Sequence, residues 1–307
     1  MIKLFNINDY VIDTAKFTGI HDEIVEVFEQ RIADFVGAKY ACGISSATNA
    51  TFLALLDKNT KITVPSILPP VVCNAILTSG NKVDFSDNID WVGDSYVLHS
   101  FDEYKIVDSA QKIEKNQYKQ ECNSEDLMIF SFYPTKPIGS YDGGMVVSDD
   151  KEKIDWFKLM CKNGTKFNSQ SWQREIIRPG YKMYLNAIQA FIANQNFDKL
   201  EEKYEKLSFV RDWYNSEFSL NNTSNHLYRI NVLDRNRILK SAKQLNIELG
   251  IHYKSLHSGT IYSVDSGCKY PLSEHDSETT VSLPFNEKLT KEDIDKVVNL
   301  VSKYERL

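Results

Sequence analysis

The sequence predicts an α/β protein in two parts: a large domain over residues 1–220, built on a mainly parallel mixed sheet, and a smaller α+β domain over 221–307. Two observations carry this prediction. Short apolar segments alternate with segments of helical periodicity, which is typical of a parallel sheet covered on both faces. The chain also has 307 residues, enough for two domains at roughly 150 residues each. The polar stretch 221–225 is the best candidate for a linker between them.

The first half of the chain shows one clear helix followed by a series of strands. Apolar side chains recur at helical spacing over residues 22–36, and Gly37 follows as a C-cap. A short apolar strand at 40–44 leads through the cluster 45–48 into a second helix that runs to Leu56. Further segments share the apolar character of buried strands: 61–64, 82–85, 95–99, 105–107, 127–132 and 145–148.

The second half is expected to begin with helix and to end in the small domain. Residues 185–218 are compatible with one long helix or with two in sequence, because apolar side chains recur there at helical spacing. Beyond the linker the pattern predicts a strand, a helix at 235–245, further strands and a final helix. Thr290 is placed to cap that last helix, with Asp293 three residues on.

Composition and charge argue against several classes of protein. Hydrophobic residues make up 42% and charged residues 25% of the chain, as in ordinary globular proteins. The net charge of −6 argues against nucleic acid or a membrane surface as a partner. The longest apolar stretch, 64–77, is interrupted by prolines and is not a membrane helix. The five cysteines form no closely spaced pair and no signal peptide is visible, so we expect a cytoplasmic protein with reduced thiols and no metal site.

Two polar features stand at the ends of predicted strands. In Ser45-Ser46-Ala47-Thr48, hydroxyls and backbone N–H groups at a helix N-terminus can bind an anion, although ordinary helix capping explains the same residues. Asp108 directly follows the strand 105–107, at the end where open α/β sheets bind ligands. Its carboxylate can pair with a ligand cation or simply cap a helix.

The third feature is Lys136, on a turn after the buried strand 127–132. Partial removal of its amine from water lowers the pKa and makes the amine nucleophilic, although most lysines are only surface charges. Gly139, Gly143 and Gly144 lie close by in a chain with only 13 glycines. An anion site, a carboxylate and a nucleophilic lysine together suit pyridoxal 5'-phosphate (PLP), which presents a phosphate, a ring nitrogen and an aldehyde.

A series of short motifs runs along most of the chain. In order they are Phe28-Glu29-Gln30, Phe35-Val36-Gly37-Ala38-Lys39-Tyr40, Ser45-Ser46-Ala47-Thr48, Val64-Pro65-Ser66, Asn74-Ala75-Ile76-Leu77, Val107-Asp108-Ser109-Ala110-Gln111, Phe130-Ser131-Phe132-Tyr133-Pro134-Thr135-Lys136, Gly143-Gly144-Met145-Val146, Gly180-Tyr181-Lys182, Ile188-Gln189-Ala190, His226-Leu227-Tyr228, Gly250-Ile251-His252-Tyr253, Leu256-His257 and Leu283-Pro284. Each is moderately specific, but their order and combination are strongly so. The sequence resembles the DegT/DnrJ/EryC1/StrS family of PLP-dependent nucleotide-sugar aminotransferases, which have the type I aspartate-aminotransferase fold.

The resemblance implies a role for each matching residue of the cofactor site. Lys136 is expected to bond covalently to the aldehyde of the cofactor and to move protons during catalysis. Asp108 is expected to pair with the pyridine nitrogen, and Gln111 to contact the ring hydroxyl. The residues expected to hold the phosphate come from two segments and are Ala47, Thr48 and Ser131.

The resemblance also implies partners and substrates. Lys182 occupies a position from which a polar residue of the partner subunit reaches the phosphate, so a homodimer with shared active sites is expected. The expected amino donor is glutamate, and the acceptor is a keto-sugar linked to a nucleotide diphosphate, as in deoxyamino-sugar biosynthesis. Candidates to line the sugar pocket are Tyr133, His252 and His257, and either histidine can instead be structural. Candidate diphosphate partners, each more often a surface charge, are Lys162, Lys166, Arg174, Arg178 and Lys254.

Three departures from the family pattern stand out. Ala47 replaces the usual glycine of the phosphate site. Pro69 replaces the aromatic residue that often stacks on the cofactor ring; a proline ring can still pack there, but weaker retention of the cofactor is expected. Only about twenty residues bridge Asp84 and Val107, where the family carries a further strand–helix excursion and another helix, so several dozen residues are missing.

Two other functions are compatible with the sequence. One is a PLP-dependent sugar dehydratase of the same fold, but those enzymes carry histidine in place of the lysine, so Lys136 argues against it. The other is a non-catalytic protein that binds the cofactor or a sugar, which the contraction and Pro69 would allow. Retention of Asp108, Gln111, Ser131 and Lys136 together favours the aminotransferase.

Overall fold

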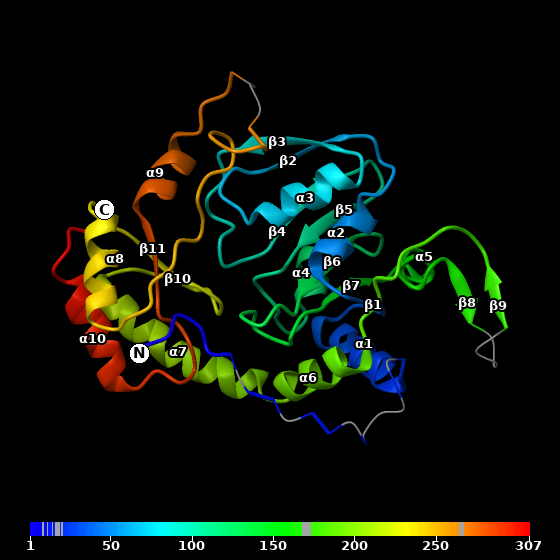
Figure 1. Ribbon diagram of the computed structural model, residues 1–307, viewed down its shortest axis with the longest axis horizontal. Helices are drawn as coiled ribbons and strands as arrows, with labels where there is room; N and C mark the ends of the chain where they lie inside the picture. Colours follow the sequence, from blue (N-terminus) through cyan, green and yellow to red (C-terminus); the bar gives the residue numbers. More distant parts are fainter. Residues whose placement is uncertain are drawn as a thin grey trace.

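The computed structural model describes residues 1–307 except 8, 11, 14, 16–18, 20, 168–172 and 264–266. In Figure 1 a larger body built around a sheet is joined to a smaller body by two helices, α6 Ala187–Phe197 and α7 Leu200–Phe218. The stretch 185–218 thus forms two helices, one of the two alternatives that its periodicity allowed. Both ends of the chain lie at the smaller body (Figure 1).

The N-terminal elements follow the predicted pattern closely. Helix α1 Glu23–Val36 is capped by the side chain of Asp22, which accepts the N–H of Ile24 at 3.1 Å. Gly37 ends it with a φ of 82°, a left-handed conformation that favours glycine. The strand β1 Tyr40–Ile44 and the helix α2 Ala47–Ala54 come next.

The central sheet has five strands in the order β1-β7-β6-β5-β4. Among the described residues, only its β5 and β6 pair in parallel, and its other neighbouring strands are antiparallel. A separate parallel pair joins β2 Lys61–Pro65 to β3 Lys82–Ser86. The α/β class with a mixed sheet is confirmed, but the share of parallel pairs is lower than predicted. The remaining strands of the central sheet are β4 Tyr96–Ser100, β5 Lys105–Asp108, β6 Leu127–Ser131 and β7 Gly144–Ser148.

The short connection between β4 and β5 explains one antiparallel pair. The strands β4 and β5 are joined by a tight turn, closed by a 2.8 Å hydrogen bond from the N–H of Phe101 to the carbonyl of Tyr104. Parallel neighbours need a crossover connection of about a dozen residues or more, whereas antiparallel strands need only a short turn. Because the connection between β4 and β5 is short, the two strands form an antiparallel hairpin.

Helices cover the two faces of the central sheet (Figure 1), and an apolar cluster fills the space on each side. On one face lie α2, α3 Pro70–Thr78 and α5 Lys151–Cys161, with side chains such as Leu53 and Phe157 fully buried. On the other face lie α1, α6 and α4 Gln117–Glu121. Burial of both faces explains why the strands are almost continuously apolar.

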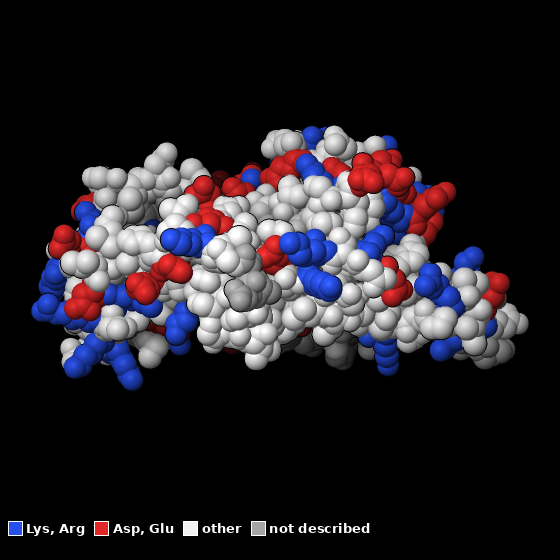
Figure 2. Space-filling model, turned by 90° about the horizontal axis from the view of Figure 1, so that it is seen from above, with Lys and Arg blue, Asp and Glu red and all other residues white. Residues whose placement is uncertain are grey.

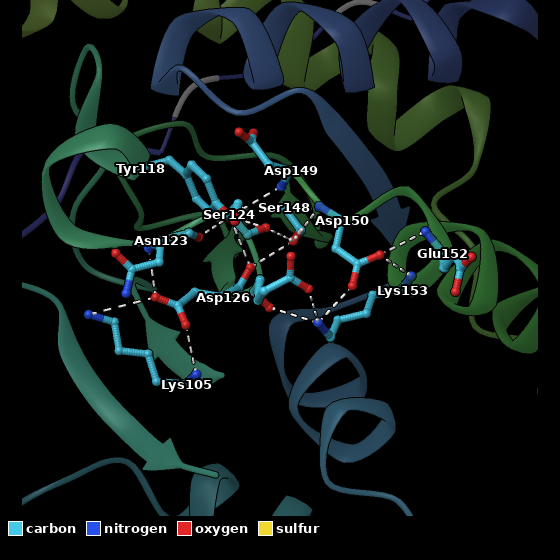
Figure 3. Close-up of polar contacts among 11 residues, drawn as sticks. Lys105, Tyr118, Asn123, Ser124, Asp126, Ser148, Asp149, Asp150, Glu152 and Lys153 are labelled. Carbon is cyan, nitrogen blue, oxygen red and sulfur yellow. Dashed lines mark hydrogen bonds and ion pairs between the residues drawn. The ribbon is translucent and has the colours of Figure 1, made fainter. Parts of the chain in front are cut away.

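The strands are fixed to one another at one end by Asp126, which lies just before β6 (Figure 3). Its buried carboxylate accepts the N–H groups of Lys105 at 2.8 Å and Asn123 at 2.7 Å. Its carbonyl accepts the hydroxyls of Tyr118 at 3.1 Å and Ser148 at 2.7 Å. These bonds join the start of β5 and of β6 to the end of β7. They hold the three strands in register, and so they also fix how the other ends of these strands are aligned.

The smaller body has its own core. Apolar side chains from Leu207 onward in α7 belong to it, whereas Leu200 at the start of α7 packs into the larger core. The helix is therefore shared between the two cores, ahead of the boundary predicted at residue 220. Thr290 and Asp293 form the predicted capping box. The elements of this body are β10 Tyr228–Asn231, α8 Arg235–Gln244, α9 Pro271–Thr279, β11 Thr280–Leu283 and α10 Lys291–Val301.

A small hairpin extends from the larger body at the side away from the smaller one (Figure 1). It consists of β8 Thr165–Phe167 and β9 Arg174–Ile176, and its Ile176 is 79% exposed. On the face shown in Figure 2, basic and acidic side chains are interspersed. Within the described part of the chain, no helix combines the length and the apolar character needed to cross a membrane.

Candidate active site

A cavity of about 520 Å³ opens where β5 and β6 end and α2 begins. It brings together segments that lie far apart in the sequence, from the first third of the chain to the smaller body. The predicted site residues among its lining are Ala47, Thr48, Pro69, Asp108, Gln111, Ser131, Tyr133, Lys136 and His252. The other lining residues are Ser46, Thr51, Val71, Val72, Trp91, Asp94, Ala110, Thr135, Asp142 and Tyr253.

The first turn of α2 forms one end of the cavity. The hydroxyl of Ser46 accepts the N–H of Asn49 at 3.1 Å and so caps the helix. Within the described residues, the N–H groups of Ala47 and Thr48 have no acceptor and stand at the positive end of the helix dipole. Gly144 of β7 passes close behind this turn, since a Cβ there would lie 2.5 Å from the backbone nitrogen of Ala47. The arrangement suits a bound anion.

Asp108 ends β5 and is only 7% exposed. One carboxylate oxygen accepts the N–H of Ala110 at 3.0 Å, and the other accepts the hydroxyl of Tyr96 at 3.1 Å. Burial raises the pKa of Asp108 above its ordinary value, while these two hydrogen bonds and the positive charge of Lys136 oppose the rise. A carboxylate in this position favours a cationic or protonated partner in the cavity.

Lys136 lies on the loop between β6 and β7, which is closed by a 2.8 Å hydrogen bond from the N–H of Phe132 to the carbonyl of Gly143. Burial lowers the pKa of the Lys136 amine to about 8, opposed by the charge of Asp108. A substantial fraction of the amine is therefore neutral near physiological pH and can act as a nucleophile or a base. Lys203 of α7 supports the loop by donating to the carbonyl of Pro137 at 3.0 Å.

His226 is a neighbour of Lys136 that the reasoning from strand ends did not identify as a site residue. Its Nε2 lies 3.5 Å from the Nζ of Lys136, and its ring stacks on Phe5 at 5.6 Å. Burial, with the nearby charge of Lys136, lowers the pKa of His226 well below its usual range. The imidazole is therefore neutral. The motif that contains His226 was visible in the sequence, but its approach to Lys136 depends on the packing of the two bodies.

Gln111 is almost fully buried and both ends of its amide are hydrogen-bonded. Its oxygen accepts the N–H of Gly93 at 2.7 Å, and its nitrogen donates to the hydroxyl of Tyr253 at 2.8 Å. Gln111 thus lines the cavity, as predicted, and also anchors Tyr253 from the smaller body. The amide nitrogen carries a second N–H and the oxygen a second lone pair, so a ring hydroxyl of a ligand can also bond to this amide.

Pro69 lies on the cavity wall at the start of α3, where an aromatic side chain was expected from the family pattern. A second segment supplies an aromatic group to the same cavity, since Trp91 also lines it. The indole N–H of Trp91 donates to the carbonyl of Ile67 at 3.1 Å, and its ring is parallel to that of Tyr253 at 6.0 Å. Trp91 follows β3 on an irregular loop, so no periodicity identified it.

His257 does not line the cavity, and the expectation for it is corrected. Its Nδ1 lies 2.5 Å from the hydroxyl of Ser66, and its Nε2 lies 3.4 Å from Glu274. It is a structural histidine between the larger body and α9. His252 does line the cavity; its Nδ1 lies 2.8 Å from the hydroxyl of Ser282, and burial lowers its pKa to about 4.

The remaining predicted residues lie outside the cavity of a single chain. Lys182 and Arg178 are exposed and are not part of its lining. Lys162 is paired with Glu26 at 4.0 Å. The other candidate diphosphate partners also lie outside the lining: Lys166, Arg174 and Lys254.

Comparison with known proteins identifies the family. A sequence model of the DegT/DnrJ/EryC1/StrS aminotransferase family matches residues 7–92 and 102–302. The chain belongs to this family. It is 27% identical, over 350 aligned positions, to the UDP-4-amino-4,6-dideoxy-N-acetyl-beta-L-altrosamine transaminase of Campylobacter jejuni subsp. jejuni serotype O:2; the alignment covers 94% of this chain and 93% of the relative. The predicted family and enzyme class, an aminotransferase, are confirmed.

Solved structures confirm the fold. The chain superposes on the aminotransferase TlmJ from Streptoalloteichus hindustanus with a TM-score of 0.82 at 18% identity, covering 99% of this chain and 98% of that one. It also superposes on Helicobacter pylori PseC, an aminotransferase involved in the biosynthesis of pseudoaminic acid, with a TM-score of 0.76 at 20% identity. This superposition covers 98% of this chain and 99% of that one. The type I transferase fold follows from these likenesses.

The family match leaves out one stretch of this chain. The matched segments leave out residues 93–101, which contain β4. The alignment with the Campylobacter jejuni transaminase runs over 350 positions, more than the 307 residues of this chain, so it carries gaps on this chain's side. The hairpin of β4 and β5 stands where the chain departs from its family.

Proposed function

We propose that this protein is a PLP-dependent aminotransferase that transfers an amino group from glutamate to a keto-sugar carried on a nucleotide diphosphate. One observation carries the proposal: a half-buried lysine whose pKa is lowered to about 8 lies in a 520 Å³ cavity together with a buried carboxylate. Such a pair has little structural benefit, because burial of both groups costs stability.

The residues present fit the cofactor. The unpaired N–H groups of Ala47 and Thr48 would hold its phosphate, helped by the hydroxyls of Thr48 and Ser131, and the absence of a side chain at Gly144 allows the backbone to approach there. Asp108 would face the pyridine nitrogen and keep it protonated. Lys136 would bond to the aldehyde.

The cofactor, when bound, supplies an aldehyde that bonds to amines and a ring that accepts electrons. The chain's own residues do the rest. The Lys136 amine would move the proton of the donor's α-carbon, since its pKa lies near physiological pH. The Asp108 carboxylate would stabilise the positive charge on the protonated ring nitrogen opposite it. Val72 and Trp91 exclude water from one wall of the cavity.

The proposed sugar substrate rests on the relatives. The names of the Campylobacter jejuni relatives denote transaminases of UDP-linked amino sugars. In this chain Tyr133, which is 55% exposed, and His252 line the cavity and would contact the sugar. We extend the same class of substrate to this protein.

The proposal includes a homodimer in the cytoplasm. Lys182 is exposed and does not line the cavity of its own subunit. It is therefore available to reach the phosphate in the active site of a partner subunit, as the family resemblance implies. Cys42, Cys73, Cys122 and Cys161 are free thiols, as expected in a reducing compartment.

The test uses the purified protein and a panel of nucleotide-linked 3- and 4-keto-sugars. Protein loaded with PLP should be yellow, lose that band with borohydride, and lose it with glutamate as the amine is taken up. Glutamate-dependent amination of one panel member is the expected result. Loss of water from the sugar without amine transfer would support the dehydratase instead. A protein that stays colourless with added PLP would refute both enzymes.

A further inference from the structure

The hairpin that replaces the family's longer segment brings Tyr96 to the active site. In the antiparallel ladder of β4 and β5, Tyr96 lies directly opposite Asp108. Side chains directly opposite one another in such a ladder project from the same face of the sheet. The hydroxyl of Tyr96 donates to one oxygen of Asp108 at 3.1 Å.

Tyr96 is held in one position. Its side chain is only 9% exposed, and its ring packs against Trp91 at 4.8 Å. Trp91 is itself fixed by its bond to the carbonyl of Ile67. Burial and the charge of Asp108 raise the pKa of Tyr96 well above its ordinary value, so the hydroxyl keeps its proton and remains a donor.

The two hydrogen bonds to Asp108 act on different oxygens. Ala110 donates its N–H to one oxygen, and Tyr96 donates to the other. The carboxylate is therefore fixed in rotation. The positive charge of Lys136 also acts on this carboxylate. Removal of the Tyr96 hydroxyl would leave one oxygen buried and without this donor.

This contact belongs to the part of the chain outside the family match. Tyr96 lies within residues 93–101, between the two matched segments. The Asp108 motif lies inside the second matched segment. The contracted chain thus supports a family residue with a neighbour of its own.

We propose that Tyr96 is a positioning residue that orients the Asp108 carboxylate toward the ring nitrogen of the bound cofactor. This inference rests on the proposed function, since it requires Asp108 to face that nitrogen. Tyr96 itself touches neither cofactor nor substrate in this role.

The experiment measures the dissociation constants of two ligands from the apoprotein: PLP, and its 1-deaza analogue, in which C–H replaces the ring nitrogen. Tyr96→Phe keeps the ring against Trp91 and removes only the hydroxyl. The loss of one hydrogen bond to a charged group is expected to weaken PLP binding about tenfold. Binding of the 1-deaza analogue should be unchanged, because it offers Asp108 no partner.

Two controls separate positioning from general damage. Tyr214→Phe removes a buried hydroxyl that donates to the carbonyl of Pro284 at 3.1 Å in the smaller body, and it should affect neither ligand. In an Asp108→Asn background, Tyr96→Phe should cause no further loss of PLP affinity. The melting temperature of each apoprotein shows that it is folded.

The outcomes are distinct. An equal loss of affinity for PLP and the 1-deaza analogue, or no loss for either, would overturn the role of Tyr96 while the proposed function stands. A wild-type protein that binds neither ligand would overturn the proposed function and this inference with it. A selective loss for PLP that disappears in the Asp108→Asn background supports the inference.

Discussion

The Nζ of Lys136 lies 3.5 Å from the Nε2 of His226, and burial disfavours a positive charge on both groups. The pKa of Lys136 falls to about 8, and that of His226 lies well below its usual range. At neutral pH the positive charge is therefore on Lys136, and the neutral His226 accepts a hydrogen bond from the ammonium group. The surroundings of Lys136 thus bring its pKa close to physiological pH.

The first prediction concerns the stability of the apoprotein. The folded state releases the Lys136 proton near pH 8 and the unfolded state only near pH 10.5, so the unfolded state binds more protons between these values and stability rises with pH there. Below pH 8 the buried charge costs roughly 3 kcal/mol, reduced to about 2 because the side chain is half-buried.

Lys136→Met should therefore raise the melting temperature at neutral pH, and the gain should disappear above pH 10.5. Thermal unfolding of both apoproteins across this pH range checks it. Lys39→Met, at a largely exposed lysine, is the matched control. A difference that stays constant across the whole range would contradict the assignment.

The second prediction concerns Asp108. The pKa of Asp108 is higher in the folded than in the unfolded state. Just above the ordinary carboxyl pKa the folded state therefore binds more protons than the unfolded state, and stability falls as the pH rises. The cost of the buried charge persists at neutral pH. Asp108→Asn removes that charge and should make the apoprotein more stable. The same change should lower the rate of glutamate-dependent bleaching by about 10²–10³-fold, because an electrostatic partner in the reaction is lost. Stopped-flow absorbance and thermal unfolding measure the two effects, and a variant that is both less stable and fully active would contradict them.

The third prediction concerns Pro69, which lies on the cavity wall where an aromatic residue is expected. Pro69→Phe should tighten PLP binding about two- to tenfold, since ring stacking contributes about 0.5–1.5 kcal/mol. Equilibrium dialysis of the apoprotein measures it. Unchanged affinity would mean that Trp91 already fills this role.

The fourth prediction concerns Gly144. A Cβ there would lie 2.5 Å from the nitrogen of Ala47 and 2.6 Å from the carbonyl carbon of Ser46, both backbone atoms that cannot move aside cheaply. Gly144→Ala should destabilise the protein by about 1–3 kcal/mol and weaken binding of inorganic phosphate to the apoprotein. Denaturant unfolding and calorimetric titration check it. Gly19→Ala, at a position where no atom of the described residues lies within 4 Å of the added Cβ, should change neither quantity.

The local pattern of the sequence was sufficient for much of the fold. The helix over 22–36 and the strand over 40–44 were predicted almost to the residue, because capping by Asp22 and Gly37 and the spacing of apolar side chains are local properties. The hairpin of β4 and β5 was not predicted. The sequence predicted a shortened segment there, but the direction of β4 depends on the sheet into which it packs.

The sequence by itself determined the family and the enzyme class, and it predicted cofactor residues in order along the chain, from Ala47 to Lys136, because those motifs are short and local. Only the tertiary structure decided which other groups surround them. His226 reaches Lys136 from the smaller body, Tyr96 reaches Asp108 across a ladder, and His257 stays outside the cavity. The physical reason is that burial and hydrogen bonding, which set the pKa of Lys136 and the orientation of Asp108, arise from residues distant in sequence and adjacent only after folding.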